Sequence, residues 1–269
     1  MIHVTDPADP RIADYSGVKQ PARLVEEGLF VAEGRFVVRR LLATHPTRVR
    51  SLLLSASAFA GLSDALANSA ITAEVIVATP NVVEAVTGFN LHRGCLALAE
   101  RPDQRPLDSL PATPLVVVLE RVTDADNVGS VFRSAEAFGA DLVVLSLGCA
   151  DPLYRKAIRT SAGSTFAVPF VSATSWPETL SLLRAQGLVV AALTPDIATH
   201  EIGAFVQTGA ARGPIALLLG TEGHGLSNDA LALADVRIRI PMGGTLDSLN
   251  IATAAGIALH RLHDVRRHP

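Results

Sequence analysis

Residues 115–145 read LVVVLERVTDADNVGSVFRSAEAFGADLVVL, and they indicate the architecture of this chain most clearly. The run 115–120 is apolar up to a final glutamate, as in a strand buried on both faces of a parallel sheet. Residues 127–138 have helical spacing of apolar side chains, and 141–145 form a second apolar strand. A strand, a crossover helix and a second strand make a parallel βαβ unit.

The same alternation continues to the end of the chain. The sequence predicts further strands at 189–193, 215–219 and 236–240, and helices at 151–161, 176–186 and 247–261. Alternating strands and helices are typical of a parallel sheet with helices on both faces. We therefore expect an α/β fold for this half of the chain.

A smaller α/β region precedes a proline-rich break. Its predicted elements are helices at 34–42, 63–68 and 81–86 and strands at 49–54, 74–78 and 92–99. The stretch 101–114, RPDQRPLDSLPATP, holds four prolines and has no apolar periodicity, which is typical of a linker. We expect a small domain at 1–103, a linker at 104–113 and a larger domain at 114–269.

The composition is that of a folded protein. The 269 residues are 49% hydrophobic and 18% charged, whereas disordered chains combine low hydrophobicity with high net charge. The apolar runs are far shorter than the roughly 20 residues that span a bilayer, and the start, MIHVTDPADPRIADY, lacks the basic and apolar regions of a signal peptide. Cys95 and Cys149 are too few for a four-ligand zinc site. We expect a cytoplasmic protein with no metal and no membrane segment.

The charge balance alone does not indicate a nucleic-acid-binding protein. The net charge is −3, whereas such proteins commonly carry basic surfaces. However, all 23 basic residues except Lys19 and Lys156 are arginine. Arginine is the better side chain for bidentate phosphate contacts, although GC-rich coding is an equally simple explanation of the excess.

Ligands of open parallel sheets bind at the carboxyl ends of the strands, so the segments that follow buried strands are the candidate sites. The first such segment carries Asp124, Asp126 and Asn127, and Arg133 comes six residues after Asn127. The aspartates and Asn127 suit the N-cap of a helix. Arg133 either pairs with Glu136 on the surface or acts in a site, and spacing leaves both open.

The second segment is LLLGTEGHGLSN at 217–228, in which Glu222 lies among glycines at the end of a buried strand. A glycine such as Gly220 permits close approach of a ligand to the backbone. The segment is neither a dinucleotide fingerprint nor a phosphate loop, because GxGxxG and GK[ST] are both missing. His224 is either catalytic or an ordinary loop histidine.

The third segment is IRIPMGGTLDSLNIATAAG at 238–256. Asp247 or Ser248 suits the N-cap of the last helix, and Asn250 would be a polar residue of its first turn. The small residues of this helix suit close packing against another helix or another chain.

In this order, the three segments resemble the SpoU/TrmH family of RNA ribose 2′-O-methyltransferases, within the SPOUT class. The family motifs are matched by DADNVGSVFR (124–133), GTEGHGL (220–226) and IPMGGTLDSLNIATAAG (240–256), and RKAIRTSAGSTFAVPF (155–170) is also similar. Ala125 departs from the pattern, because a proline usually follows the aspartate; the turn is then less rigid. The resemblance covers about 115–261.

The resemblance implies a deep trefoil knot, made by the second and third motifs, that binds S-adenosylmethionine. The implied cofactor contacts are Gly220, Ile240 and Leu249 through their backbone, with Met242 nearby. Arg133 matches the family's essential arginine, and because a guanidinium stays protonated we expect it to clamp a substrate phosphate. Deprotonation assisted by that phosphate remains open. The residues expected to orient Arg133, the cofactor and the ribose are Asn127, Glu222, Ser248 and Asn250.

The N-terminal region is similar, more loosely, to the family's ribosomal-protein-like substrate-binding domain, through FVAEGRFVVRRLL (30–42) and TGFNLHRGCLALA (87–99). This implies RNA binding. Arg35 and Arg39, four residues apart, share one helix face, although a solvated charged face is the alternative. The family also implies a homodimer with the knots at the interface, which the small face at 252–258 would suit. The implied phosphate contacts are Arg35, Arg39, Arg40, Arg48 and Arg50.

Alternatives remain for the substrate and the activity. The separate N-terminal domain favours rRNA over tRNA, and the family also includes antibiotic-resistance rRNA methyltransferases. A silent protein that keeps the cofactor pocket is disfavoured by the intact set of Asn127, Arg133, Glu222 and Asn250. A classical dehydrogenase or small-molecule methyltransferase would need a glycine-rich loop after the first strand, which is missing.

Overall fold

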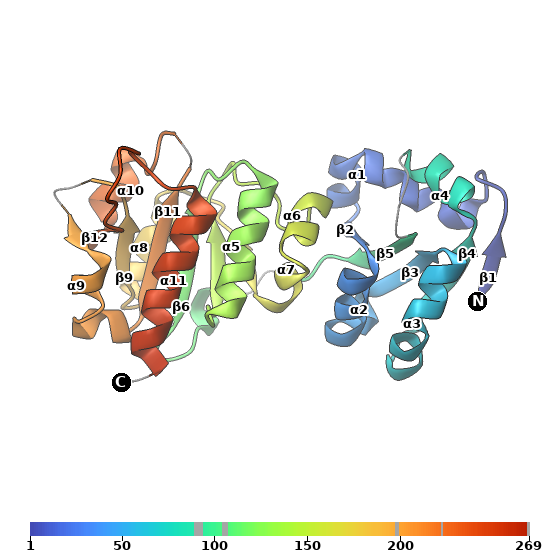
Figure 1. The fold of residues 1–269 in the computed structure, drawn as a ribbon, viewed down its shortest axis with the longest axis horizontal. Helices are drawn as coiled ribbons and strands as arrows, with labels where there is room; N and C mark the ends of the chain where they lie inside the picture. The colour runs from blue at the N-terminus through green and yellow to red at the C-terminus, as the bar shows by residue number, and fades with distance from the viewer. Residues whose placement is uncertain (89–93, 104–106, 197–198, 222, 268–269) are drawn as a thin grey trace. The chain divides into compact units, whose positions relative to one another are not determined.

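The computed structural model describes residues 1–88, 94–103, 107–196, 199–221 and 223–267. The chain forms two compact units (Figure 1). The smaller unit consists of Met1–Asp103 together with Pro152–Ala167, and the larger of Gln104–Asp151 together with Val168–Pro269. The segment Pro152–Ala167 therefore packs with the N-terminal region, although its place in the sequence is inside the expected larger domain. The roles of the two regions stay predictions.

The larger unit is built on a seven-stranded sheet in which every pairing is parallel. The strand order is β10-β12-β9-β11-β6-β7-β8. This confirms the expected α/β fold with a parallel sheet. In chain order the strands are β6 (Leu115–Glu120), β7 (Leu142–Leu145), β8 (Phe170–Ser172), β9 (Val189–Leu193), β10 (His200–Glu201), β11 (Ile215–Gly220) and β12 (Val236–Arg239).

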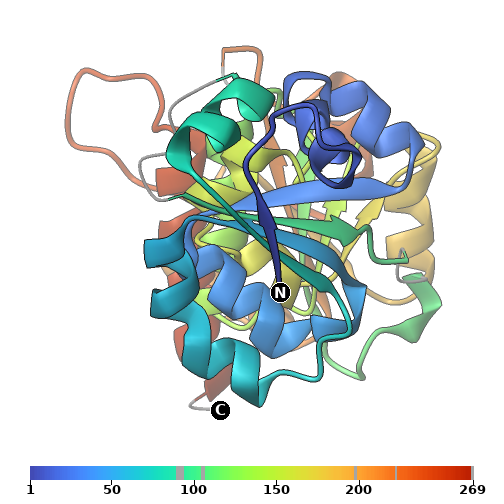
Figure 2. The same ribbon diagram turned by 90° about the vertical axis from the view of Figure 1, so that its right-hand side faces the viewer.

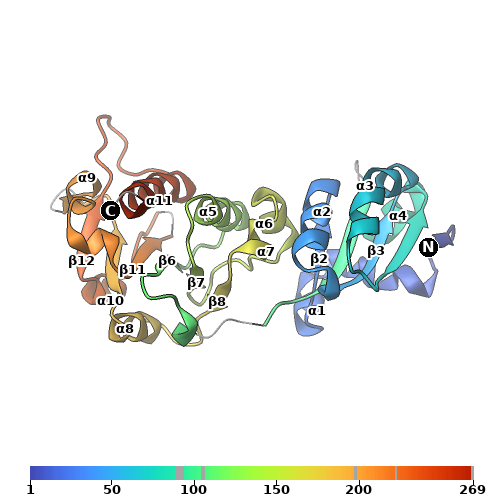
Figure 3. The same cartoon turned by 90° about the horizontal axis from the view of Figure 1, so that it is seen from below.

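Helices cover both faces of this sheet, as Figure 3 shows. On one face lie α8 (Glu178–Ala185) and α10 (Asn228–Leu233), and on the other lie α5 (Ala125–Ala137) and α11 (Ile251–Arg267). Every residue of β6 is buried, because side chains on both faces meet a helix layer. A short helix α9 (Ile202–Phe205) and 3-10 turns at Leu107–Ser109 and Gly209–Arg212 complete the unit.

Parallel strands end at one edge of the sheet, so the loops after β6, β9, β11 and β12 share the carboxyl edge. The same edge carries the first turns of α5 and α11, since each follows one of these loops. In the described ranges, no helix is long and apolar enough to cross a bilayer.

The smaller unit has a five-stranded mixed sheet in the order β1-β4-β3-β5-β2. Its first face packs against a 3-10 helix at Pro10–Lys19, α1 (Pro21–Glu26) and α4 (Pro80–Thr87), and α2 (Arg35–Thr44) and α3 (Ala56–Asn68) cover the second face (Figure 2). A further 3-10 turn at Pro46–Arg48 follows α2. The strands are β1 (Ile2–Val4), β2 (Leu29–Glu33), β3 (Val49–Leu54), β4 (Glu74–Ala78) and β5 (Cys95–Glu100).

The segment Pro152–Ala167 contributes α6 (Arg155–Thr160) and α7 (Ser164–Ala167) to the smaller unit. Arg155 forms an ion pair of 2.9 Å with Glu33 at the end of β2. Further along, the ring of Phe166 lies 5.5 Å from that of Phe30, and its carbonyl oxygen is 2.8 Å from Nε2 of His45. The segment therefore packs against β2 and α2.

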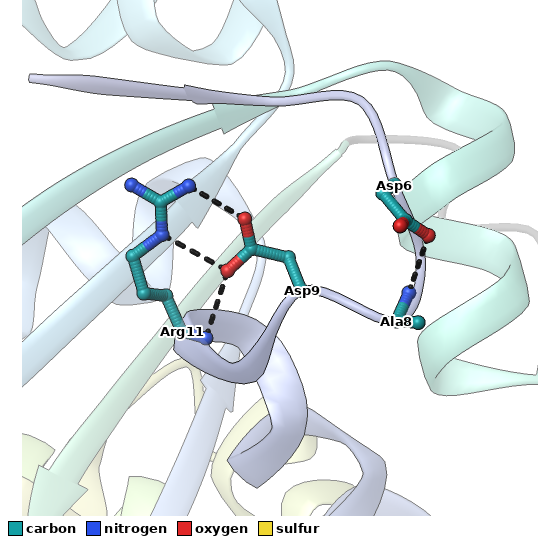
Figure 4. A network of polar contacts seen from close by, with 4 residues as sticks. All are labelled: Asp6, Ala8, Asp9 and Arg11. Carbon is teal, nitrogen blue, oxygen red and sulfur yellow. Dashed lines mark hydrogen bonds and ion pairs between the residues drawn. The ribbon is translucent and has the colours of Figure 1, made fainter.

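The turn ahead of the first 3-10 helix is shaped by local polar contacts (Figure 4). Nε and Nη2 of Arg11 donate to the two carboxylate oxygens of Asp9, at 2.9 and 2.5 Å. These hydrogen bonds lower the pKa of Asp9 to about 2. In the same turn, the carboxylate of Asp6 accepts a hydrogen bond from the backbone N–H of Ala8.

Several expected boundaries were wrong for identifiable reasons. The helix expected at 247–261 begins at Ile251, because the side chain of Asn250 caps it, and it continues to Arg267. The helix expected at 63–68 begins at Ala56, where Ser55 provides the cap. The helix expected at 151–161 begins at Arg155. The strand expected at 92–99 is β5, and residues 92 and 93 lie outside the described part.

The shortest elements were not predicted, because two to six residues are too few for periodicity to register. The strands β1, β8 and β10 have two or three residues each. The helices α1, α7, α9 and α10 have four to six. β2 (Leu29–Glu33), with five residues, was also missed.

Candidate functional site

A cavity of about 380 Å³ lies at the carboxyl edge of the larger sheet. Its walls come from the loops after β9, β11 and β12 and from the first turn of α11. The cavity is lined by all four residues expected to bind a cofactor and by two of those expected to orient the reaction, namely Gly220, Ile240, Met242, Leu249, Ser248 and Asn250. Three chain segments that are separate in the sequence thus meet at one site.

The loop after β11 folds back sharply against the end of its strand. A Cβ atom at Gly220 would lie 2.4 Å from the carbonyl carbon of Gly225, so a side chain there would require the loop to move. The backbone N–H of Gly225 donates to the carbonyl of Thr221 over 3.0 Å, and Gly225 has a positive φ of 64°. This fold-back presents main-chain atoms to the cavity. The candidate Glu222 lies outside the described residues.

Asn250 joins the third motif to the first. Its Nδ2 donates to Oδ1 of Asn127 over 3.0 Å, and its Oδ1 accepts from the backbone N–H groups of Ala252 and Thr253. One amide therefore caps α11 and reaches the first turns of α5. Asp247 or Ser248 was expected to cap this helix, but the structure assigns the cap to Asn250. At the start of α5 the cap is Asp124, which accepts from the N–H of Asp126.

Arg133 is not part of the cavity wall. It lies on α5, six residues after Asn127, which corresponds to about 9 Å along the helix. Its side chain is exposed, and among the described residues it has no hydrogen-bond or ion-pair partner. The expected alternative of a surface pair with Glu136 is therefore wrong. The guanidinium is available to an anion from outside the chain.

A buried carboxylate that was not among the predicted site residues lies beside the cavity. Glu120, the last residue of β6, is 1% exposed. Its Oε1 accepts from Trp176 Nε1 over 2.8 Å and from Ser227 Oγ over 2.6 Å, and its Oε2 accepts from the N–H of Ser227 over 2.8 Å. Ser227 ends the loop after β11 and caps α10. The sequence feature that could have indicated this residue is a carboxylate at the end of an otherwise apolar strand.

The cavity wall also includes residues that no motif indicated. Leu193, Thr194 and Pro195 follow β9, which lies beside β11 in the sheet. Periodicity located the strand, but only the strand order shows that its end lies at the cavity.

The helix α11 uses its small residues within the chain. Ala255 and Ala258 are buried, and a Cβ atom at Gly256 would lie 3.5 Å from Oγ of Ser134 on α5. The sequence allowed packing against another helix or against another chain. The described contacts are with another helix of the same chain.

The arginines of the smaller unit differ in their surroundings. Arg39 binds both carboxylate oxygens of Asp64, and its Nη2 also donates to the carbonyl of Gly61. Arg40 donates to the carbonyl of Ala162 over 3.4 Å. By contrast, Arg35 is exposed and has no hydrogen-bond or ion-pair partner in the described ranges.

The other two arginines of this set also have protein partners. Arg48 donates to the carbonyl of Arg101 over 2.9 Å and pairs with Asp103, and Arg50 pairs with Glu100. Beside Arg35 on α2, the ring of Phe36 is 62% exposed. An exposed aromatic ring among arginines is a feature of surfaces on which unpaired bases stack.

Comparisons with known proteins cover both units. Residues 114–260 match the model of the SpoU rRNA Methylase family. A relative from Mycobacterium bovis, named an uncharacterized tRNA/rRNA methyltransferase, is 39% identical over 262 residues, which is 96% of this chain and 90% of the relative. The 23S rRNA (guanosine-2′-O-)-methyltransferase RlmB of Vibrio parahaemolyticus is 32% identical over 174 residues, or 62% of this chain and 68% of that protein.

Solved structures of similar proteins extend over nearly the whole chain. The AdoMet-bound rRNA methyltransferase from Sinorhizobium meliloti has a TM-score of 0.82 and 27% identity, and covers 99% of this chain and 97% of its own. The SpoU methyltransferase AviRb from Streptomyces viridochromogenes, in complex with AdoMet, has a TM-score of 0.81 and 25% identity, with 97% and 100% covered. The family model matches more than half of the chain, including the part that carries the cavity. The chain therefore belongs to the SpoU rRNA methylase family.

Proposed function

We propose that this protein transfers a methyl group from S-adenosylmethionine to a ribose 2′-hydroxyl of RNA, with rRNA as the favoured substrate. The observation that carries the proposal is the cavity at the carboxyl edge, where the second and third motifs meet beside the Asn127–Asn250 contact. The names of the relatives, which include rRNA 2′-O-methyltransferases and AdoMet-bound enzymes, support the same activity.

The cavity fits a cofactor of this kind. About 380 Å³ lies in the range of small-molecule sites. Apolar side chains of Leu219, Ile240 and Leu249 suit the adenine ring, and the folded-back glycine loop offers backbone groups for its polar atoms. The cofactor supplies an electrophilic methyl group on a positively charged sulfur. A trefoil knot formed by the loops after β11 and β12 belongs to the proposal.

The chain's own groups have distinct tasks in this reaction. The ribose must lie in line with the methyl group, and its hydroxyl must lose a proton, to water or to the neighbouring substrate phosphate, as the new bond forms. Ser248, Asn250 and Asn127 are suited to orient the ribose by hydrogen bonds, and Glu222 belongs to the same motif set. Arg133 cannot accept a proton, so its proposed task is to hold a substrate phosphate and favour the developing alkoxide.

The smaller unit is also proposed to bind RNA. Arg35 is the strongest candidate among its arginines, because Arg39 and Arg40 are engaged with protein groups. A homodimer and a cytoplasmic location complete the proposal.

The test is transfer of labelled methyl groups to purified rRNA and purified tRNA, by the wild type and by Arg133→Ala. We expect ribose-linked label in rRNA, a loss of about 100-fold or more in the variant, and equal cofactor binding by both proteins. Label in tRNA alone would support the tRNA alternative. Cofactor binding without label in any RNA would favour a silent binding protein, and a large loss of cofactor affinity in Arg133→Ala would contradict the clamp.

A further inference from the structure

Arg121 has an unusual backbone at the carboxyl edge of the larger sheet. It follows β6 directly and has a φ of 51°, in the left-handed region. In the described ranges, only Arg121 and Ala162 combine a side chain with a positive φ. Glycine adopts this conformation without steric cost, whereas a residue with a Cβ atom is strained in it.

Neighbouring groups fix this conformation from several sides. The N–H of Arg121 donates to Oγ of Ser146 over 2.9 Å, and Ser146 is itself 5% exposed. The N–H of Val122 donates to Sγ of Cys149 over 3.4 Å, and the carbonyl of Val122 accepts from Ala150 over 2.8 Å. The turn after β6 is therefore bonded to the turn after β7, so the strained residue is held rigidly.

The side chain of Arg121 contributes little to the stability of the described structure. It is exposed, and in the described part of the chain it has no hydrogen-bond or ion-pair partner. Its stem passes near Gly148, where a Cβ atom would lie 3.8 Å from Cγ of Arg121. Other arginines of this unit do have partners, for example Arg184 with Asp235 and Arg239 with Glu201. The backbone that carries the guanidinium is thus fixed, and no described residue neutralises its charge.

We propose that Arg121 binds a backbone phosphate of the RNA substrate close to the methylated nucleotide. It lies three residues ahead of the DADNVGSVFR motif, on the edge that carries the cavity. A guanidinium matches phosphate geometry in a bidentate way and remains charged at any working pH. A rigid backbone lowers the entropy lost when the side chain binds. The inference rests on the proposed RNA methyltransferase function.

The test compares Arg121→Gly with the wild type in three measurements, namely binding of purified rRNA at several salt concentrations, binding of S-adenosylmethionine, and the thermal midpoint. Glycine removes the charge and relieves the backbone strain. We expect rRNA affinity about tenfold weaker and a salt dependence that is less steep by about one phosphate contact. Cofactor affinity should be unchanged, and the thermal midpoint equal or higher.

Arg212→Gly is the matched control. Arg212 is also exposed and without a partner in the described ranges, but it lies just before β11, at the opposite edge of the sheet. Its removal should leave rRNA affinity and the salt dependence unchanged. Arg121→Lys should recover part of the affinity, because the charge returns without the planar fork.

The outcomes separate this inference from the function on which it rests. If the wild type methylates rRNA and Arg121→Gly binds it with wild-type affinity and salt dependence, the inference is wrong and the function stands. A lower thermal midpoint together with weaker cofactor binding would assign Arg121 a purely structural role and also overturn it. A wild type that neither binds nor methylates any RNA would overturn the proposed function itself.

Discussion

Nδ2 of Asn250 lies 3.0 Å from Oδ1 of Asn127, and this contact joins two motifs that are 123 residues apart. The same Asn250 side chain caps α11 through Oδ1. One amide therefore caps α11 through its oxygen and contacts Asn127 through its nitrogen, and substitution can separate these two contacts.

Asn250→Asp should keep the cap and lose the contact with Asn127. An aspartate oxygen caps a helix as well as an asparagine oxygen does, so the free energy of unfolding should stay within about 0.5 kcal/mol of the wild type. Asn250→Ala should lose about 1 kcal/mol. Methyl transfer should fall in both variants. Urea denaturation and the methylation assay measure the two effects, and full activity in Asn250→Asp would remove Asn250 from the site.

Gly220→Ala should disrupt the cofactor cavity. The added Cβ atom would lie 2.4 Å from the carbonyl carbon of Gly225, so the loop after β11 must shift. Affinity for S-adenosylmethionine, measured by calorimetry, should fall about tenfold or more.

Gly244→Ala is the control for this change, because a Cβ atom there meets nothing within 4 Å. It should bind the cofactor as the wild type does. Equal affinity in Gly220→Ala would show that the fold-back does not form the cofactor wall.

Glu120→Gln tests the buried carboxylate. Glu120 accepts three hydrogen bonds from Trp176 and Ser227, and a glutamine would turn an NH₂ group toward at least one of these donors. An unmet donor in a buried site costs about 1–3 kcal/mol, which urea denaturation would detect. Because Ser227 ends the cavity loop, cofactor affinity should fall as well.

Ser227→Ala removes one of these hydrogen bonds and the cap of α10. The carboxylate of Glu120 keeps its two N–H donors, so cofactor affinity should fall less than in Glu120→Gln. A Glu120→Gln protein with wild-type stability would contradict the assigned hydrogen bonds.

Much of the larger unit could be predicted from its sequence, because its strands are long and apolar and its helices lie between them. The run 115–120 became β6, and DADNVGSVFR became the start of α5. The motifs also indicated six residues that meet at the cavity. Local patterns of this kind carry enough information, since each depends only on neighbours in the chain.

Other features depend on contacts between distant residues, which no local pattern contains. The packing of Phe166 against Phe30 assigns Pro152–Ala167 to the smaller unit, against its position in the sequence. The hydrogen bonds of Glu120 likewise join three separate segments. The three arginines of α2 were equivalent in the sequence, and only their neighbours distinguish them.

Burial makes the thiol of Cys95 unreactive. Desolvation raises its pKa from 9.0 to about 12, and burial also raises the pKa of Cys149. The folded protein favours the neutral thiols, so the contribution of Cys95 to stability is complete below about pH 9 and is lost as the pH rises toward 12. At pH 8, a thiol reagent should modify both cysteines rapidly in denatured protein and slowly in native protein. Rapid modification of native Cys95 would contradict the described packing.

Arg35 and Arg39 should respond differently to replacement by alanine. Arg39 holds Asp64 and lowers the pKa of that carboxylate to about 2, so the ion pair stabilises the fold above about pH 4 and is lost as the pH falls toward 2. Arg39→Ala should therefore lower the thermal midpoint clearly at pH 7 and by less at pH 2, where the ion pair is largely lost and the hydrogen bond to the Gly61 carbonyl remains. Arg35 has no such partner in the described ranges, so Arg35→Ala should leave the midpoint unchanged and weaken rRNA binding. Measuring both properties for both variants separates the two roles, and equal rRNA affinity in Arg35→Ala and the wild type would exclude α2 from the RNA surface.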